Sequence, residues 1–352
     1  MQRNPTMADV AKLAGVGTMT VSRLLSGSVT VSEETAKRIH RAIQELNYQP
    51  NEVARALRGL KTTTIGVIVP YLYDPFFAFC AHAIASVAKE HGYSVILTTS
   101  AEDPETEDRE ACQMLRRHVE GMVIIPAMQS ETYLRRPEFL GARIVTLDRP
   151  APLPRFDSVL VENKSGAAMA VEHLIEHGHR RIVAIGLSRS LYTMNMRYQG
   201  YRQALTKAKL KPEPYLDCTN HDSIAPAIFQ LLARPDPPTA FFCMNNLTMR
   251  QALLALNEIG VSIPKSVAIV GFDDFELAEI LNPTLTVVRQ PPHELGRVAA
   301  NLLFNRLADN SELPETGEKV VLPVELIVRH SCGCGSPATQ IPPGKTEAAA
   351  FA

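Results

Sequence analysis

Tryptophan is absent from the 352 residues, and aromatic residues make up only 6% of them, although hydrophobic residues make up 45%. The chain also lacks any apolar run of about 18 residues, the length that a membrane-spanning helix needs. Its first residues lead directly into a polar, helix-forming stretch, so we expect no secretion signal. These absences exclude a membrane protein and are typical of an α/β protein with a sizeable core.

A disulfide framework is also missing from the sequence. The six cysteines are scattered, mostly inside apolar runs, at Cys80, Cys112, Cys218, Cys243, Cys332 and Cys334. Such spacing predicts buried, reduced thiols and therefore a cytoplasmic protein.

Neither sign of charge is in excess over the whole chain, since the formal net charge is only -1. Residues 1–61, however, carry nine Lys and Arg against five Asp and Glu, whereas the remaining residues carry 27 against 32. A basic end on an acidic body indicates a polyanion partner for the first 61 residues.

The pattern from Thr6 to Leu46 is purely helical and falls into three short pieces. Thr6 and Asp9 have the spacing of a capping box, and Val10, Leu13 and Ala14 follow as an apolar face ending at Gly15. A second piece spans about 17–25, with Val21, Leu24 and Leu25 on one face and Gly27 after it. Ser32 is the expected N-cap of a third helix whose core positions are Ile39, Ile43 and Leu46. Two short helices joined by a tight turn, with a bracing third, indicate a helix-turn-helix unit, although periodicity alone also fits a plain three-helix bundle.

From Ile65 onward, short apolar strands alternate with amphipathic helices, which predicts an α/β body with parallel sheets. The expected strands are Ile65–Val69, Val95–Leu97, Met122–Ile125, Ile144–Leu147, Ile182–Ile185, Ala240–Cys243 and Val267–Val270. We divide the body into two lobes, because so many strands exceed one comfortable sheet. The segment from Gly335 is rich in Pro, Gly and Ala and is expected to be a flexible tail.

The stretch from Met7 to Gly27, which reads Met-Ala-Asp-Val-Ala-Lys-Leu-Ala-Gly-Val-Gly-Thr-Met-Thr-Val-Ser-Arg-Leu-Leu-Ser-Gly, resembles the headpiece of LacI/GalR-type regulators. The resemblance continues through Ile65–Pro70, Val145–Arg149, Gly178–Ile182, Arg197–Leu205, Val270–Asp274 and Pro283–Gly296. It implies a helix-turn-helix domain at 1–49, a hinge helix and linker at 50–61, and a periplasmic-binding-protein-like body at 62–334 that binds an effector and dimerises. It also implies that the late segments complete both lobes. Lobe one then comprises about 62–162 and 291–320, and lobe two about 163–290 and 321–334.

The resemblance further implies how a homodimer would read double-stranded operator DNA. Thr18, Met19 and Arg23 would point at base edges, and Thr20 and Ser22 would contact phosphates or bases. The fork of Arg23 suits guanine, with a phosphate contact as the alternative. In the hinge, Asn51, Ala54 and Leu57 would lie at the minor groove, and Leu57 would wedge between central base pairs unless it packs on its own lobe.

Polar residues that directly follow apolar strands predict the effector site, because ligands of open α/β sheets bind beyond the carboxyl ends of the strands. Asp148 and Arg149 follow one strand, Asn245 and Asn246 another, and Asp273 and Asp274 a third. The resemblance adds Arg197 over the ligand, and the first strand-to-helix loop adds Tyr73 and Phe77, while Phe76 is expected to pack in the core. We expect effector contacts from Tyr73, Phe77, Asp148, Arg197, Asn245 and Asp273, with helix capping or salt bridges as the alternative roles. Asn246 stands where the family commonly has Asp, which slightly favours a sugar acid over a neutral sugar.

Several other patterns do not change this interpretation. His173, His177 and His179 have no cysteine nearby in sequence, and Cys332 and Cys334 lack a second cysteine pair, so no metal or other cofactor is expected. Asp273 and Asp274 occur without a nucleophile motif or a phosphate loop, which argues against an enzyme. The sequence therefore predicts a repressor controlled by a sugar or sugar acid. The main alternatives are a solute-binding protein without DNA function and a sugar-converting enzyme.

Overall fold

The computed structural model describes residues 5–26, 31–48, 62–127, 131–309 and 313–334, and within them two compact units are distinguished. The first unit contains three helices, α1 (Met7–Ala14), α2 (Thr18–Ser26) and α3 (Glu33–Leu46). Val10, Val21 and Ile39, one from each helix, are fully buried and form the centre of its small core. The predicted helix-turn-helix unit is therefore present.

The helix ends and core positions of this unit match the expected pattern with two exceptions. The capping box is formed, because Asp9 Oδ2 accepts a hydrogen bond from the Thr6 backbone N–H at 2.8 Å, and Gly15 ends α1 with φ 65°. Leu13, however, is 47% exposed, because the core side of α1 is completed by Ala11 instead. Ser32 occupies the N-cap position of α3, but its hydroxyl bonds to Thr35 Oγ1 rather than to a backbone N–H.

Two six-stranded sheets build the second unit, and each forms the centre of a lobe. The first sheet has the order β11-β5-β4-β3-β1-β2, with β1 (Thr64–Val69), β2 (Ser94–Thr99), β3 (Gly121–Ile124), β4 (Arg143–Leu147), β5 (Asp157–Val161) and β11 (Lys319–Leu322). The second has the order β12-β10-β9-β8-β6-β7, with β6 (Ile182–Ile185), β7 (Glu213–Tyr215), β8 (Ala240–Cys243), β9 (Ala268–Phe272), β10 (Thr286–Arg289) and β12 (Glu325–Ile327). Strand β12 is antiparallel to β10. The α/β class with parallel-dominated sheets is confirmed, and the seven expected strands are present within two residues of their predicted ends.

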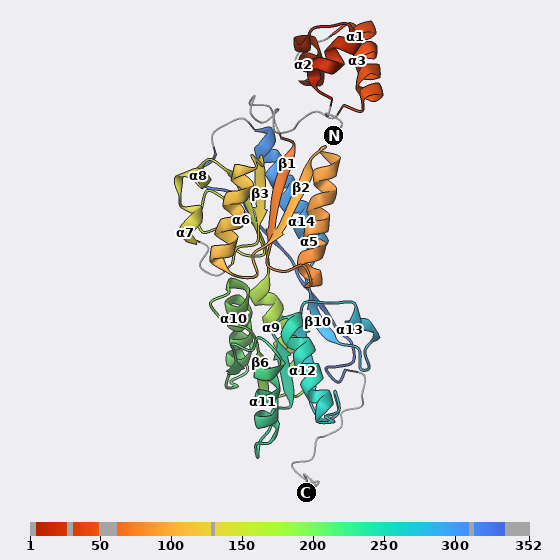
Figure 1. Ribbon diagram of the computed structural model, residues 1–352. Coiled ribbons are helices and arrows are strands. Elements are labelled where there is room, and N and C mark those ends of the chain that lie inside the picture. Colours follow the sequence, from red (N-terminus) through yellow and green to blue (C-terminus); the bar gives the residue numbers. More distant parts are fainter. Residues whose placement is uncertain (1–4, 27–30, 49–61, 128–130, 310–312, 335–352) are drawn as a thin grey trace. The chain divides into compact units, whose positions relative to one another are not determined.

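Helices cover the sheets and are drawn in Figure 1. Lobe one carries α5 (Pro75–Glu90), α6 (Pro104–Arg116), α7 (Glu131–Leu134), α8 (Pro137–Leu140) and α14 (Pro292–Ala308). Lobe two carries α9 (Asn163–Glu176), α10 (Tyr192–Lys207), α11 (His221–Leu232), α12 (Asn246–Glu258) and α13 (Leu277–Ile280). None of the helices in the described ranges is both long and apolar enough to cross a membrane.

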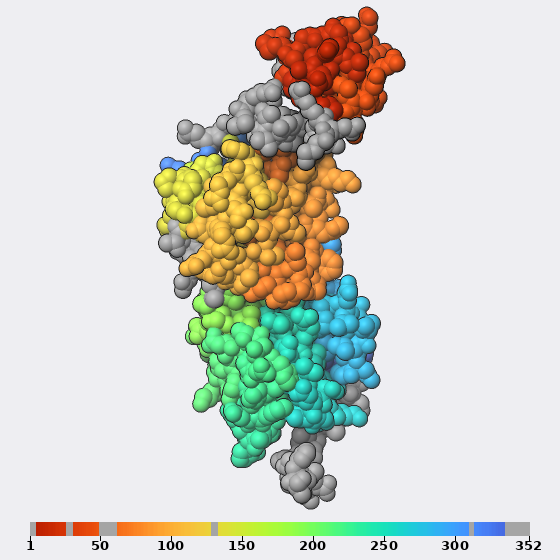
Figure 2. All heavy atoms as spheres, in the orientation of Figure 1, coloured from red at the N-terminus to blue at the C-terminus, as the bar shows by residue number. Residues whose placement is uncertain are grey.

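The chain passes between the lobes more than once. It leaves lobe one after β5, enters α9 of lobe two, and returns after β10 to form α14 and β11. A last passage between Leu322 and Glu325 leads to β12, slightly later than the expected boundary near 320. In Figure 2 the orange and yellow surface of the first lobe meets the green and blue surface of the second. The connections bring the carboxyl ends of both sheets to one region.

Two glycines permit the closest helix contacts of the lobes. A Cβ on Gly200 of α10 would lie 2.1 Å from the carbonyl oxygen of Lys164 in α9, and one on Gly296 of α14 would lie 2.4 Å from that of Cys80 in α5. Neither position can hold a larger side chain without moving a helix. These pairs fix α9 and α5, whose first turns lie beside the functional site.

Candidate functional sites: an exposed recognition helix and an inter-lobe cavity

Helix α2 presents its predicted DNA-contacting residues on its outer side. Thr18, Met19 and Arg23 are exposed, and Met19 is 67% exposed despite its apolar side chain. Thr20 and Ser22 are half-buried, and Val21 lies in the core on the opposite side. No acidic residue occupies the first turn of α2, so nothing there opposes an approaching phosphate. The hinge residues Asn51, Ala54 and Leu57 lie outside the described residues.

A cavity of about 290 Å³ opens where residues from both lobes converge. All six residues predicted to contact the effector line it, namely Tyr73, Phe77, Asp148, Arg197, Asn245 and Asp273. Phe76, expected in the core, also lines the cavity while it packs partly against the core of lobe one. The lining residues come from both lobes and lie far apart in the sequence. They meet because both sheets direct their carboxyl ends toward this space.

Asp148 and Asp273 occupy equivalent positions in the two lobes. Asp148 follows β4 and its backbone N–H donates to Val159 of β5, and Asp273 follows β9 and its N–H donates to Val288 of β10. Both residues have positive φ, 65° and 75°, a conformation that Asp tolerates better than most residues. The backbone strain turns two buried carboxylates into the cavity, a common feature of functional sites.

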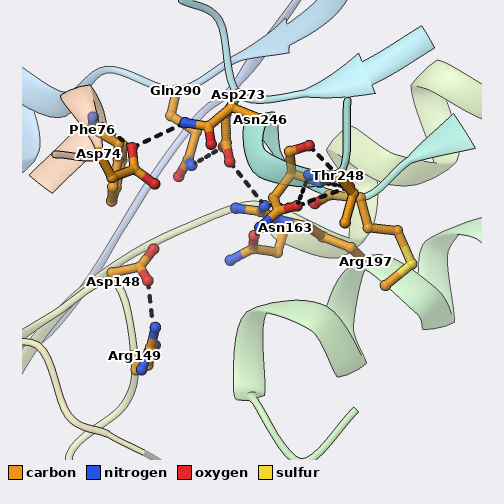
Figure 3. A network of polar contacts seen from close by, with 12 residues as sticks. Asp74, Phe76, Asp148, Arg149, Asn163, Arg197, Asn246, Thr248, Asp273 and Gln290 are labelled. Carbon is orange, nitrogen blue, oxygen red and sulfur yellow. Dashed lines mark hydrogen bonds and ion pairs between the residues drawn. The ribbon is translucent and has the colours of Figure 1, made fainter. Parts of the chain in front are cut away.

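Arg197 of α10 is held by a buried network that Figure 3 shows. Its Nε donates to Asn163 Oδ1 at 2.8 Å, and its Nη1 donates to the carbonyl oxygen of Met244 at 2.7 Å and lies 3.3 Å from Asp273 Oδ2. Asp273 in turn accepts a hydrogen bond from Gln290 Nε2. The guanidinium also lies over the ring of Phe272, 3.7 Å from its centre. Arg197 therefore positions Asp273 as well as lining the cavity.

Arg149 and Asp74 have partners that the sequence did not indicate. Both terminal nitrogens of Arg149 bind Glu102, at 2.6 and 2.5 Å. Asp74 caps α5 by accepting from the Phe76 N–H, and it also accepts from Asn246 Nδ2 of lobe two at 2.9 Å. Asn246 does not line the cavity but forms a hydrogen bond between the lobes.

Some buried polar atoms of the cavity residues have no hydrogen-bond partner within the described part of the chain. These are Asp148 Oδ1, Gln290 Oε1, Arg149 Nε and Arg250 Nε. Buried polar atoms in proteins are nearly always satisfied, so these atoms require a partner from a ligand or from water. Two of the four are acceptors and two are donors, which favours a ligand whose groups both donate and accept hydrogen bonds, as hydroxyl groups do.

Burial also disturbs the ionisation of the cavity carboxylates. It raises the pKa of Asp148 to about 6, although the positive charges of Arg149 and Arg197 oppose the shift. Burial raises the pKa of Asp74 as well, while the hydrogen bond from Asn246 lowers it. A ligand hydroxyl that donates to Asp148 would stabilise its ionised form and relieve this cost.

Glu102, Arg250 and Gln290 line the cavity but were not predicted. Gln290 directly follows β10, so the rule that found Asp148 and Asp273 would have found it if β10 had been recognised in the sequence. Glu102 lies in the loop after β2, and Arg250 lies one turn inside α12, where no strand end marks it.

The histidines and C-terminal cysteines that the sequence analysis set aside are neighbours in space. Cys334 Sγ lies 3.1 Å from His173 Nε2 and 3.0 Å from His177 Nε2. The expectation that no cysteine ligand is available to these histidines holds along the sequence but is wrong in three dimensions. Cys332 is buried, and Cys334 is half-buried. His179 bonds to Thr239 Oγ1 through Nδ1, in agreement with its expected structural role.

Comparison with known proteins supports both halves of this description. Residues 6–51 match the family description "Bacterial regulatory proteins, lacI family", and residues 171–332 match "Periplasmic binding protein-like domain". The HTH-type transcriptional repressor PurR of Haemophilus influenzae (strain PittEE) is 31% identical over 339 residues, which cover 93% of this chain and 98% of the repressor. PurR of Aliivibrio salmonicida is 30% identical over 86% of this chain and 92% of its own.

Two solved structures show the same arrangement. The Lac repressor dimer bound to operator and the anti-inducer ONPF is similar with a TM-score of 0.80 and 25% identity, covering 94% of this chain and 99% of that one. The complex of the transcriptional regulator CelR with cellobiose has a TM-score of 0.67 and 32% identity, covering 93% and 99%. The chain belongs to the lacI family of bacterial regulatory proteins, and it is a DNA-binding repressor controlled by a small-molecule effector rather than an enzyme.

Proposed function

We propose that the effector is a hydroxyl-rich small molecule, a sugar or sugar acid, bound in the inter-lobe cavity. The observation that carries this proposal is the pair of unpartnered acceptors, Asp148 Oδ1 and Gln290 Oε1, beside the carboxylate of Asp273. Neighbouring hydroxyl groups supply donors at the short spacing that such acceptors need. The cavity is also of the size usual for small ligands.

Aromatic rings give the cavity a face for the apolar side of a sugar ring. Tyr71 and Tyr73 stack with ring centres 4.9 Å apart, and both line the cavity with Phe76. Tyr73 is 68% exposed, which leaves its ring available to a ligand. Stacking of this kind combines apolar contact with a polar hydroxyl at the ring edge.

The charge of the ligand depends on which arginine is available to it. Both terminal nitrogens of Arg149 bind Glu102, and its Nε, which makes no hydrogen bond in the described part of the chain, lies 3.5 Å from Asp148 Oδ2. Arg197 is engaged by Asn163 and Asp273, whereas the buried Nε of Arg250 has no hydrogen-bond partner among the described residues. Asn246, which stands where the family commonly has Asp, donates a hydrogen bond to Asp74. Because this contact explains the amide at position 246, the substitution gives no support to an anionic ligand. A neutral sugar therefore fits best, and a sugar acid would use Arg250.

A thermal-shift screen with neutral sugars, sugar acids and nucleobases tests the ligand class. Neutral sugars should raise the melting temperature, and Asp273→Asn should abolish this shift. Asp236→Asn, which changes a carboxylate that is 90% exposed and outside the cavity, should preserve it. A shift produced by nucleobases alone would overturn the proposal.

We further propose that each segment of the chain has the role that the family pattern implies. Residues 1–49 bind DNA, 50–61 form the hinge, 62–334 bind the effector and dimerise, and 335–352 form a tail. Thr18, Met19 and Arg23 read bases, Thr20 and Ser22 contact phosphates or bases, and Asn51, Ala54 and Leu57 reach the minor groove. A repressor of bacterial DNA acts in the cytoplasm, so that location is part of the proposal.

Fluorescence anisotropy with DNA from upstream of the protein's own gene tests the coupling between the two functions. The effector identified in the screen should change operator affinity by about 5- to 150-fold, the usual scale of allosteric coupling. Leu57→Ala should weaken operator binding and leave effector affinity unchanged. Normal operator affinity in that variant would contradict the wedge role of Leu57.

A further inference from the structure

A compact group of two histidines and two cysteines lies in lobe two, and we call it the His-Cys cluster. His173 belongs to the last turn of α9, His177 caps it, and Cys332 and Cys334 follow β12. Cys334 Sγ lies 2.8 Å from Cys332 Sγ and 3.1 and 3.0 Å from the Nε2 atoms of His173 and His177. The potential ligand atoms of His173, His177 and Cys334 all lie within 4.8 Å of one another.

One histidine is already oriented as a ligand. His177 Nδ1 lies 2.7 Å from the carbonyl oxygen of His173, which can only accept, so Nδ1 carries the proton. The lone pair is therefore on Nε2, the atom that faces Cys334. A metal-binding histidine typically donates its other N–H to a carbonyl in this way, which fixes both tautomer and ring orientation.

The surroundings also favour a cation. The cluster lies at the C-terminal end of α9, where the helix dipole is negative. Cys332 is buried, whereas His177 is exposed, so the cluster has both a dry side and an entry path.

We propose that His173, His177, Cys332 and Cys334 form a tetrahedral site for a thiophilic divalent ion, with Zn²⁺ as the natural occupant. Two imidazole nitrogens and two thiolates are a characteristic ligand set for structural zinc. Bonds of about 2.0–2.3 Å in tetrahedral geometry separate ligand atoms by roughly 3.3–3.8 Å. The three contacts of Cys334 Sγ, now 2.8, 3.1 and 3.0 Å, would have to lengthen by less than about 1 Å to receive the ion.

The ion would bind the end of the described chain to helix α9. The same helix begins at Asn163, which holds Arg197 beside the effector cavity. His173 lies ten residues further on, about 15 Å along the helix axis. The site is therefore distinct from the cavity, and its role is to stabilise the helix that supports one wall of it.

Titration of the full-length, reduced and chelator-treated protein with Zn²⁺ alone tests the proposal. We expect one ion per chain, a higher melting temperature with the ion, and thiolate-to-metal absorption when Co²⁺ replaces Zn²⁺. Cys334→Ser and His177→Gln should each weaken Zn²⁺ binding by more than the roughly 10- to 100-fold that loss of an outer partner costs.

Matched controls come from residues of the same types outside the cluster. Cys112→Ser changes a half-buried cysteine of α6, and His82→Gln changes an exposed histidine of α5, so both should keep wild-type Zn²⁺ affinity. Binding that persists in Cys334→Ser, or an absence of stoichiometric Zn²⁺ in the reduced wild-type protein, would overturn the proposal. So would Co²⁺ spectra without thiolate bands, or an oxidised Cys332–Cys334 pair that forms in preference to the metal complex when Zn²⁺ is present.

Discussion

Asp148 and Asp273 face the cavity from left-handed backbone positions, and both are almost completely buried. Two carboxylates so placed weaken the unliganded protein, because a buried charge without a full set of donors is costly. The cost becomes useful when a ligand supplies the missing donors. These two residues therefore lower the stability of the unliganded protein and raise its affinity for the ligand.

Asp148→Asn should make the unliganded protein more stable at pH 7.5 and less sensitive to pH. The folded-state pKa of Asp148, about 6, exceeds the ordinary value of 3.8, so its contribution to stability is present at low pH and is lost as the pH rises through 6. Between pH 5 and 7.5 this loss amounts to about 1 kcal/mol of unfolding free energy. Asn tolerates the positive φ, so the backbone should be unaffected.

Urea unfolding of wild type and variant at both pH values measures this difference. Glu107, whose pKa burial raises to about 7, contributes a similar slope in both proteins and cancels in the comparison. An identical pH dependence in the two proteins would show that Asp148 is ionised throughout this range.

At the scale of single elements, the capping box at the start of α1 gives a direct comparison between two N-caps. Thr6→Ala should destabilise α1 by about 1 kcal/mol, because Thr6 Oγ1 accepts from the Asp9 N–H and donates to Asp9 Oδ2 at 2.6 Å. Ser32→Ala at the start of α3 is the control and should cost less, since the Ser32 side chain makes no backbone cap bond. Hydrogen exchange of the α1 amides in the full chain should accelerate about fivefold in Thr6→Ala only. Equal effects of the two substitutions would contradict the structural difference.

Two exposed arginines of the DNA-binding unit, one on α2 and one on α3, should differ in their importance for operator binding. Arg23→Ala should weaken operator binding by about 1–3 kcal/mol and relax specificity at one base pair, as expected for a guanine contact. Arg41→Ala, which changes an exposed residue of α3, should have a much smaller effect. Binding to single-base operator variants provides the measurement. A uniform loss across all sequences, with a weaker salt dependence, would indicate that Arg23 contacts phosphate instead.

At the scale of the whole effector-binding body, the hydrogen bond from Asn246 to Asp74 connects the two lobes beside the cavity (Figure 3). Asn246→Asp would replace the donor with a second carboxylate. We expect this substitution to lower the free energy of unfolding by roughly 1–3 kcal/mol. It should also lower effector affinity, because the hydrogen bond between the lobes is lost.

Exchanging the two residues tests this explanation. Asp74→Asn combined with Asn246→Asp restores one donor and one acceptor, and Asn caps α5 as well as Asp does. Effector titration should show an affinity close to wild type in the double variant and a reduced affinity in Asn246→Asp alone. If the double variant is as weak as the single one, the contact does not couple the lobes.

The helices of the first unit, the seven strongly apolar strands and five of the six cavity residues could be predicted from the sequence alone, because periodicity, capping and strand ends are encoded by residues close together in the chain. Arg197, the sixth, was indicated by the family resemblance. Which of these groups come into contact depends on the packing of the folded chain. Gln290 was missed because β10 has only two apolar residues, Val287 and Val288, between Thr286 and Arg289, and the engagement of Arg149 by Glu102 depends on neighbouring loops of one sheet. The two halves of the His-Cys cluster are separated by more than 150 residues, so no local pattern could join them. Contacts across such distances follow from sheet order and helix packing, which the chain sets only when it folds.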